Sequence, residues 1–268
     1  MSIFNKYFKK IFVINLYDNE ERWKQVEKQF KNRKIKVERF IAVDGRCKKG
    51  EKDCLQKLKT FELTYNVKIP IKKKSKLSKI LPAASLTIGT ILLLRAMVKN
   101  KWKHILICED DILLSRGITN KFEKGIKEIG KKKWDLLYLG AGGECGYKDI
   151  SWDKKYKYKS PWNDNGSLDD VFYVKHINDL RVPCDIEECP PFSDNISNVN
   201  FCGGTWCYAY SLSGAKKVLK LIDNNANNHI DQILMKATQK NKIKVLAFDP
   251  PIVWHENLRD GRKTDIPW

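Results

Sequence analysis

The feature that most constrains the fold of this chain is the alternation of short apolar runs with segments of helical pattern. The apolar runs are rich in β-branched and aromatic residues, which predicts buried strands. These runs stand at 9–16, 36–45, 103–108 and 134–140, at the start of 201–223, and within 244–255. The helical patterns stand at 19–30, 86–99, 116–130, in the second half of 201–223, and at 229–240. Strands that alternate with helices predict a doubly wound α/β sheet.

The rest of the chain has a weaker pattern. Residues 46–80 are rich in lysine and predict an irregular excursion, and 171–177 alternate as an exposed strand does. Residues 141–170 are rich in Gly, Asp, Ser and Lys, which predicts a long loop that closes over a ligand. Asp18 and Glu21 have the spacing of a capping box at the start of the first long helix. No internal repeat or distinct linker divides the chain.

Composition indicates a globular protein, since 42% of the 268 residues are hydrophobic and 31% are charged. The longest apolar run, 86–94, is shorter than the roughly 20 residues that span a bilayer, so no transmembrane segment is expected. No signal-peptide cleavage site is seen, and we expect a cytoplasmic protein. The eight cysteines form no CxxC pair and are expected to be reduced, with bridges 184–189 and 202–207 left open.

The positive charge is uneven, because residues 1–80 carry 23 Lys and Arg against 9 Asp and Glu, within a formal net charge of +19. Such a surface attracts nucleic acid, anionic glycans or phosphorylated ligands. The alternative is a composition that is rich in lysine, asparagine and isoleucine throughout. The lysines are not interleaved with aromatic residues, and this disfavours a protein that binds single-stranded nucleic acid.

Three consecutive carboxylates, Glu109, Asp110 and Asp111, follow the buried run 103–108 directly. In open α/β sheets, ligands bind beyond the carboxyl ends of the strands. Adjacent carboxylates repel one another unless a cation lies among them, and hard divalent ions commonly bridge protein carboxylates to a diphosphate. Alternation along a strand sends Glu109 and Asp111 to one side and Asp110 to the other. The alternative is a solvated acidic turn in which an aspartate caps the next helix.

Six motifs, in this order and spacing, resemble glycosyltransferase family 25, which includes lipopolysaccharide and collagen galactosyltransferases. They are VINLYDNEER, AVDG, ICEDD, WDLLYLG, GGTWCYAYSLSGAKKVL and HIDQIL, and the resemblance runs from about Lys10 to Glu256. It implies a single GT-A domain over 1–268 with a mixed sheet. The nucleotide-binding part would span about 9–140 and the acceptor part about 141–268. It also implies a UDP-sugar donor and Mn²⁺, or Mg²⁺ in its place.

The resemblance implies a nucleotide-sugar site. The backbone of Asn15 and Leu16 would contact the base, and Arg22 the base or the diphosphate. Gly204 and Thr205 would lie close to the sugar, where a glycine permits close backbone approach. The alternative for Arg22 is a surface residue in the first turn of a helix, a place that the helix dipole makes unfavourable for a cation. For Gly204 and Thr205 the alternative is an ordinary turn.

For the metal, the resemblance implies Glu109 and Asp111 as ligands, with Asp110 turned toward the ribose. A late histidine, His255, would complete the metal sphere, because imidazole is an acceptable ligand for Mn²⁺. Asp231 would be the base that takes the proton of the acceptor hydroxyl. The alternatives are a structural role for His255 and a helix N-cap or first-turn acid for Asp231. His229, which precedes Asp231, is a weaker candidate for the site.

Three positions depart from the family pattern or remain open. The family's Ser-His pair in the helix at 86–95 is replaced by Leu93 and Leu94, and the histidine that follows G-T in many members is Trp206. Two polar groups are thus expected to be missing near the site, which bears on the acceptor and on activity. Asp44 in AVDG is interpreted as an Asx-turn before Gly45, with a nucleotide contact as the alternative.

The combined prediction is an enzyme that moves a hexose, galactose or glucose, from a UDP-sugar to a glycan or a hydroxylated, collagen-like protein acceptor. Trp152, Trp162 and Trp206 are candidates to stack on sugar rings, although tryptophan more often packs in a core. UDP-N-acetylglucosamine is the alternative donor. A catalytically silent binding module of the same fold is the alternative function, and a protein that binds nucleic acid is the least favoured. The sequence does not predict the oligomeric state.

Overall fold

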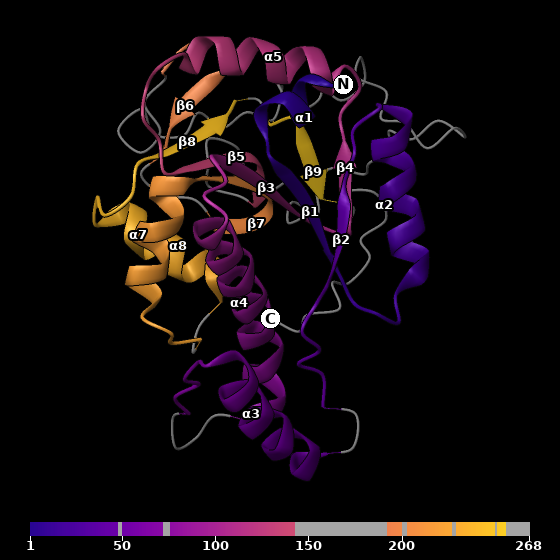
Figure 1. Cartoon of the computed structure of the whole chain (residues 1–268), viewed down its shortest axis with the longest axis vertical. Helices are drawn as coiled ribbons and strands as arrows, with labels where there is room; N and C mark the ends of the chain where they lie inside the picture. The colour runs from indigo at the N-terminus through magenta and orange to yellow at the C-terminus, as the bar shows by residue number, and fades with distance from the viewer. Residues whose placement is uncertain are drawn as a thin grey trace, which may run out of the picture.

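The structure is a computed structural model that describes residues 1–47, 50–71, 76–142, 192–199, 203–226, 229–249 and 251–255. Its centre is a seven-stranded sheet with the order β2-β1-β3-β7-β5-β8-β6 (Figure 1). The strands are β1 (Lys10–Asn15), β2 (Glu38–Ile41), β3 (His104–Glu109), β5 (Leu136–Gly142), β6 (Ile196–Asn198), β7 (Gly203–Ser211) and β8 (Val245–Phe248). β1 is parallel to β2 and β3, and β5 is parallel to β8. β7 runs antiparallel between β3 and β5, and β6 is antiparallel to β8.

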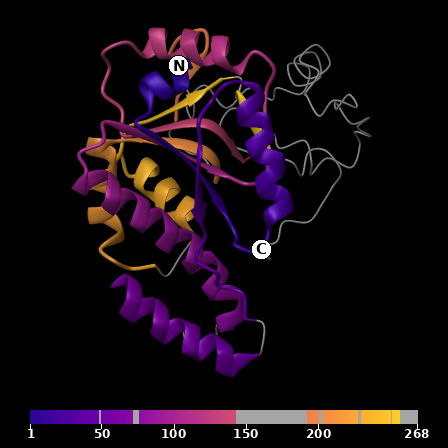
Figure 2. The same ribbon diagram turned by 45° about the vertical axis from the view of Figure 1, so that its right-hand side comes forward.

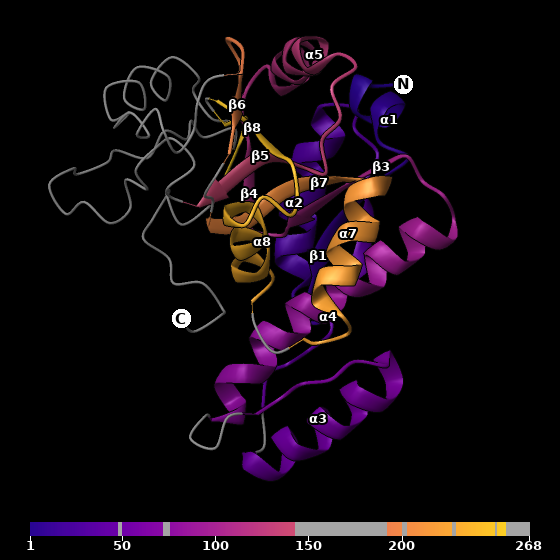
Figure 3. The same ribbon diagram turned by 90° about the vertical axis from the view of Figure 1, so that its left-hand side faces the viewer.

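Helices cover both faces of this sheet (Figures 1 and 3). The helices are α1 (Ile3–Tyr7), α2 (Glu20–Asn32), α4 (Leu77–Lys99), α5 (Ile118–Ile129), α7 (Leu212–Ile222) and α8 (Ile230–Gln239). Successive side chains of a strand point to opposite faces. Ile105 and Ile107 of β3 therefore pack in the core with α4, α7 and α8, and Leu106 and Cys108 pack in the core with α1, α2 and α5. The predicted doubly wound α/β sheet, with mixed strand directions, is confirmed.

Residues 46–80 differ from the prediction of an irregular excursion. They contain helix α3 (Glu51–Tyr65), and α4 begins at Leu77 instead of 86. α3 lies beyond the sheet and packs against α4 (Figure 2). Of its side chains, Cys54 and Phe61 are buried, so the helix has too narrow an apolar face for a clear sequence pattern. The predicted capping box is also wrong, because Asn19 is the N-cap residue of α2 and Asp18 binds Arg46.

The expectation of reduced cysteines is wrong for one pair. Cys47, in the loop after β2, forms a disulfide with Cys54 of α3. The fold of α3 brings the two residues together, and that helix was missed in the sequence. Cys207 is a free, buried thiol beside Cys108, with the two Sγ atoms 2.9 Å apart, so it does not form the bridge 202–207. The other open pair, 184–189, lies outside the described residues.

Helix α4 is the one helix in the described part of the chain that is long and apolar enough to cross a membrane. Its most apolar window has a mean hydropathy of 1.7, and 67% of that window is buried inside the protein. The core helix of a folded domain has the same length and composition. Because the helix begins at Leu77, it is longer than the apolar run 86–94 on which the sequence prediction rested.

Some predictions cannot be compared with the structure. The predicted loop 141–170 falls outside the described residues except for its first two residues, which end β5. The predicted strand 171–177, Trp152 and Trp162 also lie outside the described residues. The division of the chain into a nucleotide-binding part and an acceptor part stays a prediction.

A second sheet has two strands and pairs the segment that follows β3 with a late segment of the chain. β4 (Ile112–Leu114) pairs with β9 (Val253–His255) in antiparallel register, with Ile112 opposite His255. β9 crosses β5 closely, because a Cβ atom at Gly140 would lie 2.1 Å from the carbonyl oxygen of Val253. Glycine at this position therefore permits the approach that sets the place of β9.

We expect Gly140→Ala to displace β9 and to lower the free energy of unfolding by about 1–3 kcal/mol, the usual cost of overpacking. The measurement is urea denaturation. The matched control is Gly89→Ala in α4, where the added methyl group would meet Phe40 at 3.4 Å, an ordinary contact, and alanine favours the helix. Equal stability of the Gly140→Ala variant and the wild type would show that β9 is not held by this contact.

Candidate active site

The acidic triplet lies at the carboxyl end of β3, as the sequence predicts. Glu109 is the last residue of the strand, and Asp110 and Asp111 form the turn into β4. Glu109 and Asp111 lie together beside His255, whereas Asp110 lies beside Asn15 of β1. The predicted alternation of the three side chains is confirmed. The alternative of a solvated acidic turn is wrong, because Asp111 is only 8% exposed.

The predicted metal ligands are brought into one cluster. Glu109, Asp111 and His255 each offer a ligand atom, and these atoms lie within 4.8 Å of one another. His255 reaches the cluster through the β4–β9 pairing, and its Nε2 lies 3.2 Å from Asp111 Oδ2. The other oxygen of Asp111, Oδ1, is buried without a hydrogen-bond partner. Two carboxylates and an imidazole suit Mn²⁺, and an unsatisfied buried oxygen is where a cation would bind.

The pKa values of the three carboxyl groups are shifted because the groups lie close together and are shielded from solvent. Burial, and then the charge of Asp111, raises the pKa of Glu109 to about 8. The same two causes raise the pKa of Asp110 to about 6. Burial alone would also raise the pKa of Asp111, but the hydrogen bond with His255 and the charges of His255 and Arg22 lower it. Without a cation, the site thus favours a protonated Glu109 and an ionised Asp111.

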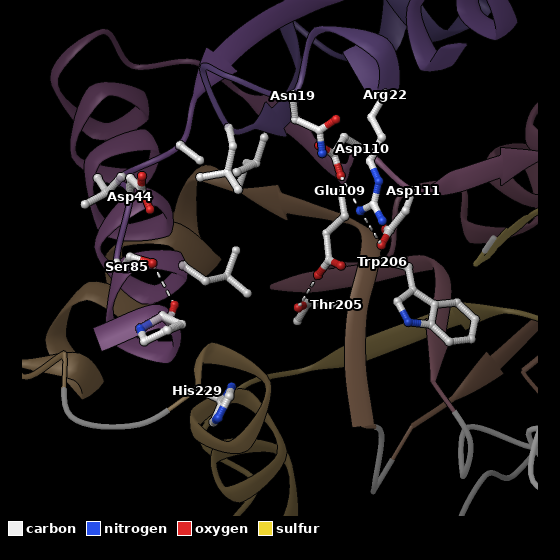
Figure 4. A pocket seen from close by; sticks show the side chains of 18 of the residues that line it. Asn19, Arg22, Asp44, Ser85, Glu109, Asp110, Asp111, Thr205, Trp206 and His229 are labelled. Carbon is white, nitrogen blue, oxygen red and sulfur yellow. Dashed lines mark hydrogen bonds and ion pairs between the residues drawn. The ribbon is translucent and has the colours of Figure 1, made fainter. Parts of the chain in front are cut away.

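Arg22 lies in the first turn of α2 and points at the triplet (Figure 4). Its Nη1 atom is 3.5 Å from Asp110 Oδ1 and 3.4 Å from Asp111 Oδ2, and 23% of its side chain is exposed. The helix dipole disfavours a cation at this position, and the two carboxylates offset that cost. The alternative of an ordinary surface arginine is therefore wrong. Arg22 belongs to the same pocket wall as the acidic triplet.

Asn15 has a role that the sequence did not reveal. Its side-chain Nδ2 donates to Asp110 Oδ2 at 2.5 Å and to the Asn19 carbonyl at 3.0 Å, and its Oδ1 accepts from Arg39 Nε at 2.8 Å. The side chain of Asn15 is buried behind the pocket and holds Asp110 in place, whereas Leu16 lines the pocket itself. The one signal in the sequence is that the polar Asn15 ends an apolar strand, because a buried polar side chain needs a hydrogen-bond partner.

Strand β7 supplies the wall below Glu109. Gly204 has a φ of 72°, in the left-handed region that glycine adopts most readily, and this bend leads into Thr205. Thr205 Oγ1 donates to Glu109 Oε1 at 3.2 Å. The ring of Trp206 lies 5.2 Å from the ring of His255, between centroids. All three β7 residues line the pocket, which places the two predicted residues Gly204 and Thr205 at the site.

The opposite wall is formed by the loop after β2 and by α4 (Figure 4). Asp44 Oδ1 accepts from the backbone amide of Arg46 at 3.0 Å, which confirms the predicted Asx-turn. The hydrogen bonds with the Arg46 side chain lower the pKa of Asp44 to about 2. Asp44 also lines the pocket, so the alternative of a nucleotide contact stays open. From α4, the pocket is lined by Pro82, Ser85, Leu86 and Gly89.

Asp231 and His229 line the same pocket from the start of α8. His229 is the N-cap residue and makes no side-chain capping bond, and Asp231 lies in the first turn. Of the two structural alternatives for Asp231, the first-turn acid fits and the N-cap does not. The Oδ1 atom of Asp231 accepts from the adjacent Gln232 amide at 2.7 Å. The structure therefore brings Asp231 to the pocket, and its role as the base stays a prediction.

Leu93 and Leu94, which replace the family's Ser-His pair, are 2% and 0% exposed and lie in the hydrophobic core. They do not line the pocket, which α4 contacts between Pro82 and Gly89, one turn earlier. The expectation of missing polar groups is therefore wrong for positions 93 and 94, whereas Trp206, which replaces the family's histidine, does line the pocket. The substitution changes the packing behind the site.

Comparison with known proteins identifies the family. The sequence model of glycosyltransferase family 25 (LPS biosynthesis protein) matches residues 8–234. Among solved structures, the chain is similar to mannose-1-phosphate geranyltransferase from Thermus thermophilus, with 9% identity, 89% of this chain and 72% of that chain covered, and a TM-score of 0.34. It is also similar to mouse xyloside xylosyltransferase 1 in its apo form, with 11% identity, coverage of 87% and 71%, and a TM-score of 0.31. No curated protein matches the chain.

We expect Glu109→Gln to remove metal binding without destabilising the protein. The folded pKa of about 8 lies above the ordinary value of 4.5, so this carboxyl costs stability as the pH rises through that interval. Glutamine does not titrate, and the variant's Tm in the absence of metal should be equal or higher at neutral pH. The rise in Tm on adding Mn²⁺ should be lost. The measurement is a thermal melt from pH 5 to 8, with and without Mn²⁺.

The control is Asp135→Asn, which affects a buried carboxylate outside the site that binds Lys217 Nζ at 2.6 Å. This variant should lose stability but keep the Mn²⁺-induced rise in Tm. If Glu109→Gln keeps the Mn²⁺ effect as well, Glu109 is not a metal ligand.

Proposed function

This chain belongs to glycosyltransferase family 25, and we propose that it transfers a hexose, galactose or glucose, from a UDP-sugar to a hydroxyl group of a glycan or a hydroxylated protein. The observation that supports this most directly is the cluster of Glu109, Asp111 and His255, with its unsatisfied Asp111 oxygen. The same pocket contains a cation, Arg22, and a separate carboxylate, Asp231. A diphosphate leaving group and an acceptor hydroxyl need these two kinds of residue.

In the proposed mechanism, Glu109, Asp111 and His255 hold the divalent cation, which when bound supplies positive charge for the departing diphosphate. Arg22 already lies within 3.5 Å of two carboxylates of the triplet, so its guanidinium is placed to share the diphosphate charge. Asn15 and Thr205 keep Asp110 and Glu109 in fixed positions by hydrogen bonds. The chain thus prepares the charge distribution before the donor binds.

Asp231 is proposed as the general base. Within the described part of the chain, its carboxylate accepts one hydrogen bond, from Gln232, and this leaves an oxygen to take the proton of the acceptor hydroxyl. It lies on α8, apart from the acidic triplet in the sequence and outside the metal cluster. A base that does not bind the cation keeps its basicity, as the reaction requires.

A catalytically silent module is the second candidate. The reason to consider it was the loss of the Ser-His pair, and that reason weakens because Leu93 and Leu94 lie in the core. UDP-N-acetylglucosamine is the alternative donor. Both questions can be tested by measuring UDP release from a panel of UDP-sugars, with and without Mn²⁺. We expect UDP to be released from a UDP-hexose in a reaction that depends on Mn²⁺. A silent module would bind UDP, but no UDP would be released from any of the UDP-sugars.

We expect Asp231→Asn to lower the turnover for transfer by roughly 10²–10⁴-fold with little change in UDP affinity, because a base acts in the transition state. Asparagine has the same size and can still accept a hydrogen bond from Gln232. The measurements are steady-state kinetics and calorimetry with UDP and Mn²⁺. Asp111→Asn is the comparison, since the loss of a metal ligand should abolish Mn²⁺-dependent UDP binding itself. Near-normal transfer by the Asp231→Asn variant would exclude this residue as the base.

A further inference from the structure

The end of the sheet opposite the pocket forms a continuous edge. The five strands β2, β1, β3, β5 and β8 run in one direction, and in Figure 1 the helices α2, α4, α5 and α8 each lead back to the start of one of them. Backbone hydrogen bonds join these starts, from Lys9 N to the His104 carbonyl and from Asp135 N to the Lys244 carbonyl. The triplet stands at the other end of β3, so the edge and the pocket are separated by the length of the strands.

This edge is strongly basic. The four segments that lead from α2, α4, α5 and α8 into the next strand are 33–37, 100–103, 130–135 and 240–244, and we call them the basic edge. Eleven of their twenty residues are Lys or Arg and one, Asp135, is acidic, whereas Lys and Arg make up 51 of the 268 residues in the chain. All the lysines among them are exposed. The enrichment is about threefold, so the edge does not simply reflect the average composition.

Within the described part of the chain, the two carboxylates closest to these segments in the sequence are already bound. Asp135 lies in one of the segments, and Glu38 adjoins another. Glu38 accepts from Lys10 Nζ at 2.6 Å, and Asp135 is buried and holds Lys217 Nζ at 2.6 Å. One lysine of the edge, Lys132, lies over the ring of Phe192.

The backbone shows that two of these lysines stand where lysine is unfavourable. Lys34 and Lys101 have φ values of 56° and 53°, in the left-handed region. At the equivalent position after α8, the residue that follows the C-cap is Asn241, a residue type that adopts this conformation more readily at helix ends. Residues in this region carry a backbone cost, persist where the surrounding structure holds them, and cluster at functional positions. The charge at Lys34 and Lys101 is therefore kept against the preference of the backbone.

Two simpler explanations do not account for this. Lysines near helix C-termini complement the helix dipole, but Asn241 shows that the left-handed position itself needs no cation. A chain that is rich in lysine and asparagine could place asparagine there without strain, as it does at Asn241. Neither explanation selects a lysine over an asparagine at positions 34 and 101.

We propose that the basic edge docks this protein on an anionic phospholipid bilayer, with the pocket turned toward the aqueous phase. The edge runs from β2 to β8 across five strand spacings, or roughly 24 Å at about 4.8 Å each. Clusters of lysines on this scale bind anionic lipid surfaces through diffuse attraction. Single-stranded nucleic acid fits less well, because it needs exposed aromatic rings. Of the two aromatic residues in the edge, Trp134 is buried and Trp102 packs against Phe12.

The test is cosedimentation of the full chain with vesicles of phosphatidylglycerol and phosphatidylcholine, and with vesicles of phosphatidylcholine alone. We expect binding to the anionic vesicles only, weakened by salt. The variant Lys34→Gly, Lys101→Gly, Lys133→Gln, Lys242→Gln changes one lysine in each segment of the edge. Its affinity should fall by about tenfold or more, since each lysine near the surface contributes. Equal binding to the two kinds of vesicle would overturn the proposal.

The matched control removes the same charge elsewhere, at the exposed residues Lys24, Lys52, Lys59 and Lys79, each changed to Gln. This variant should keep most of the binding, and an equal loss would show that net charge alone is responsible. Stronger, edge-dependent retention on duplex DNA than on anionic vesicles would assign the face to nucleic acid and overturn the lipid assignment.

The strain argument has its own measurement. The double variant Lys34→Gly, Lys101→Gly should have a higher Tm than the wild type while binding the anionic vesicles more weakly. A lower Tm for this variant would show that the two lysines are not held at a cost to the backbone. This inference does not depend on the proposed sugar donor, because vesicle binding is measured without it.

Discussion

The structure of the site depends on the repulsion among three buried carboxylates at the end of β3. Asp111 stays ionised because Arg22 and His255 approach it from two other parts of the chain, at 3.4 Å and 3.2 Å. Asn15 and Thr205 hold the other two carboxylates by hydrogen bonds. β1, α2, β7 and β9 therefore meet at one turn, and each of them brings one side chain that contacts a carboxylate of the triplet.

The direction of the strands gives the protein two chemically different ends. Acidic groups gather beyond the carboxyl ends, where Asp44, the triplet and Asp231 line the pocket. Lysines gather at the amino ends, in the four segments of the basic edge. Helices end beside the lysines, and the negative end of each helix dipole favours a cation there. Arg22 lies at the pocket in the first turn of α2, where the helix dipole disfavours a cation. Arg22, the cation that the helix dipole disfavours, is the one to which the proposed chemistry assigns a role.

Much of the fold and the triplet could be predicted from the sequence, because buried strands have continuous apolar runs that no surface segment imitates. Helix α3 was missed because it packs chiefly on α4 and buries too few residues to show a periodic pattern. The Cys47–Cys54 bond was missed with it. The place of Leu93 and Leu94 could not be read from the sequence either, since a helix that is apolar all round does not show where the pocket ends along its length.

The electrostatics of the site also indicate what the cation contributes. In the described part of the chain, Arg22 and His255 are the basic side chains that form ion pairs with Asp110 or Asp111. Arg22 already lies against both of these carboxylates. A diphosphate that entered this pocket alone would meet ionised Asp111 and two further carboxylates whose raised pKa values record how poorly the site accommodates negative charge. A divalent ion at Glu109, Asp111 and His255 would reverse the sign of the local potential. In the proposed function, a cation held by these residues would therefore make the pocket complementary to a nucleotide-sugar.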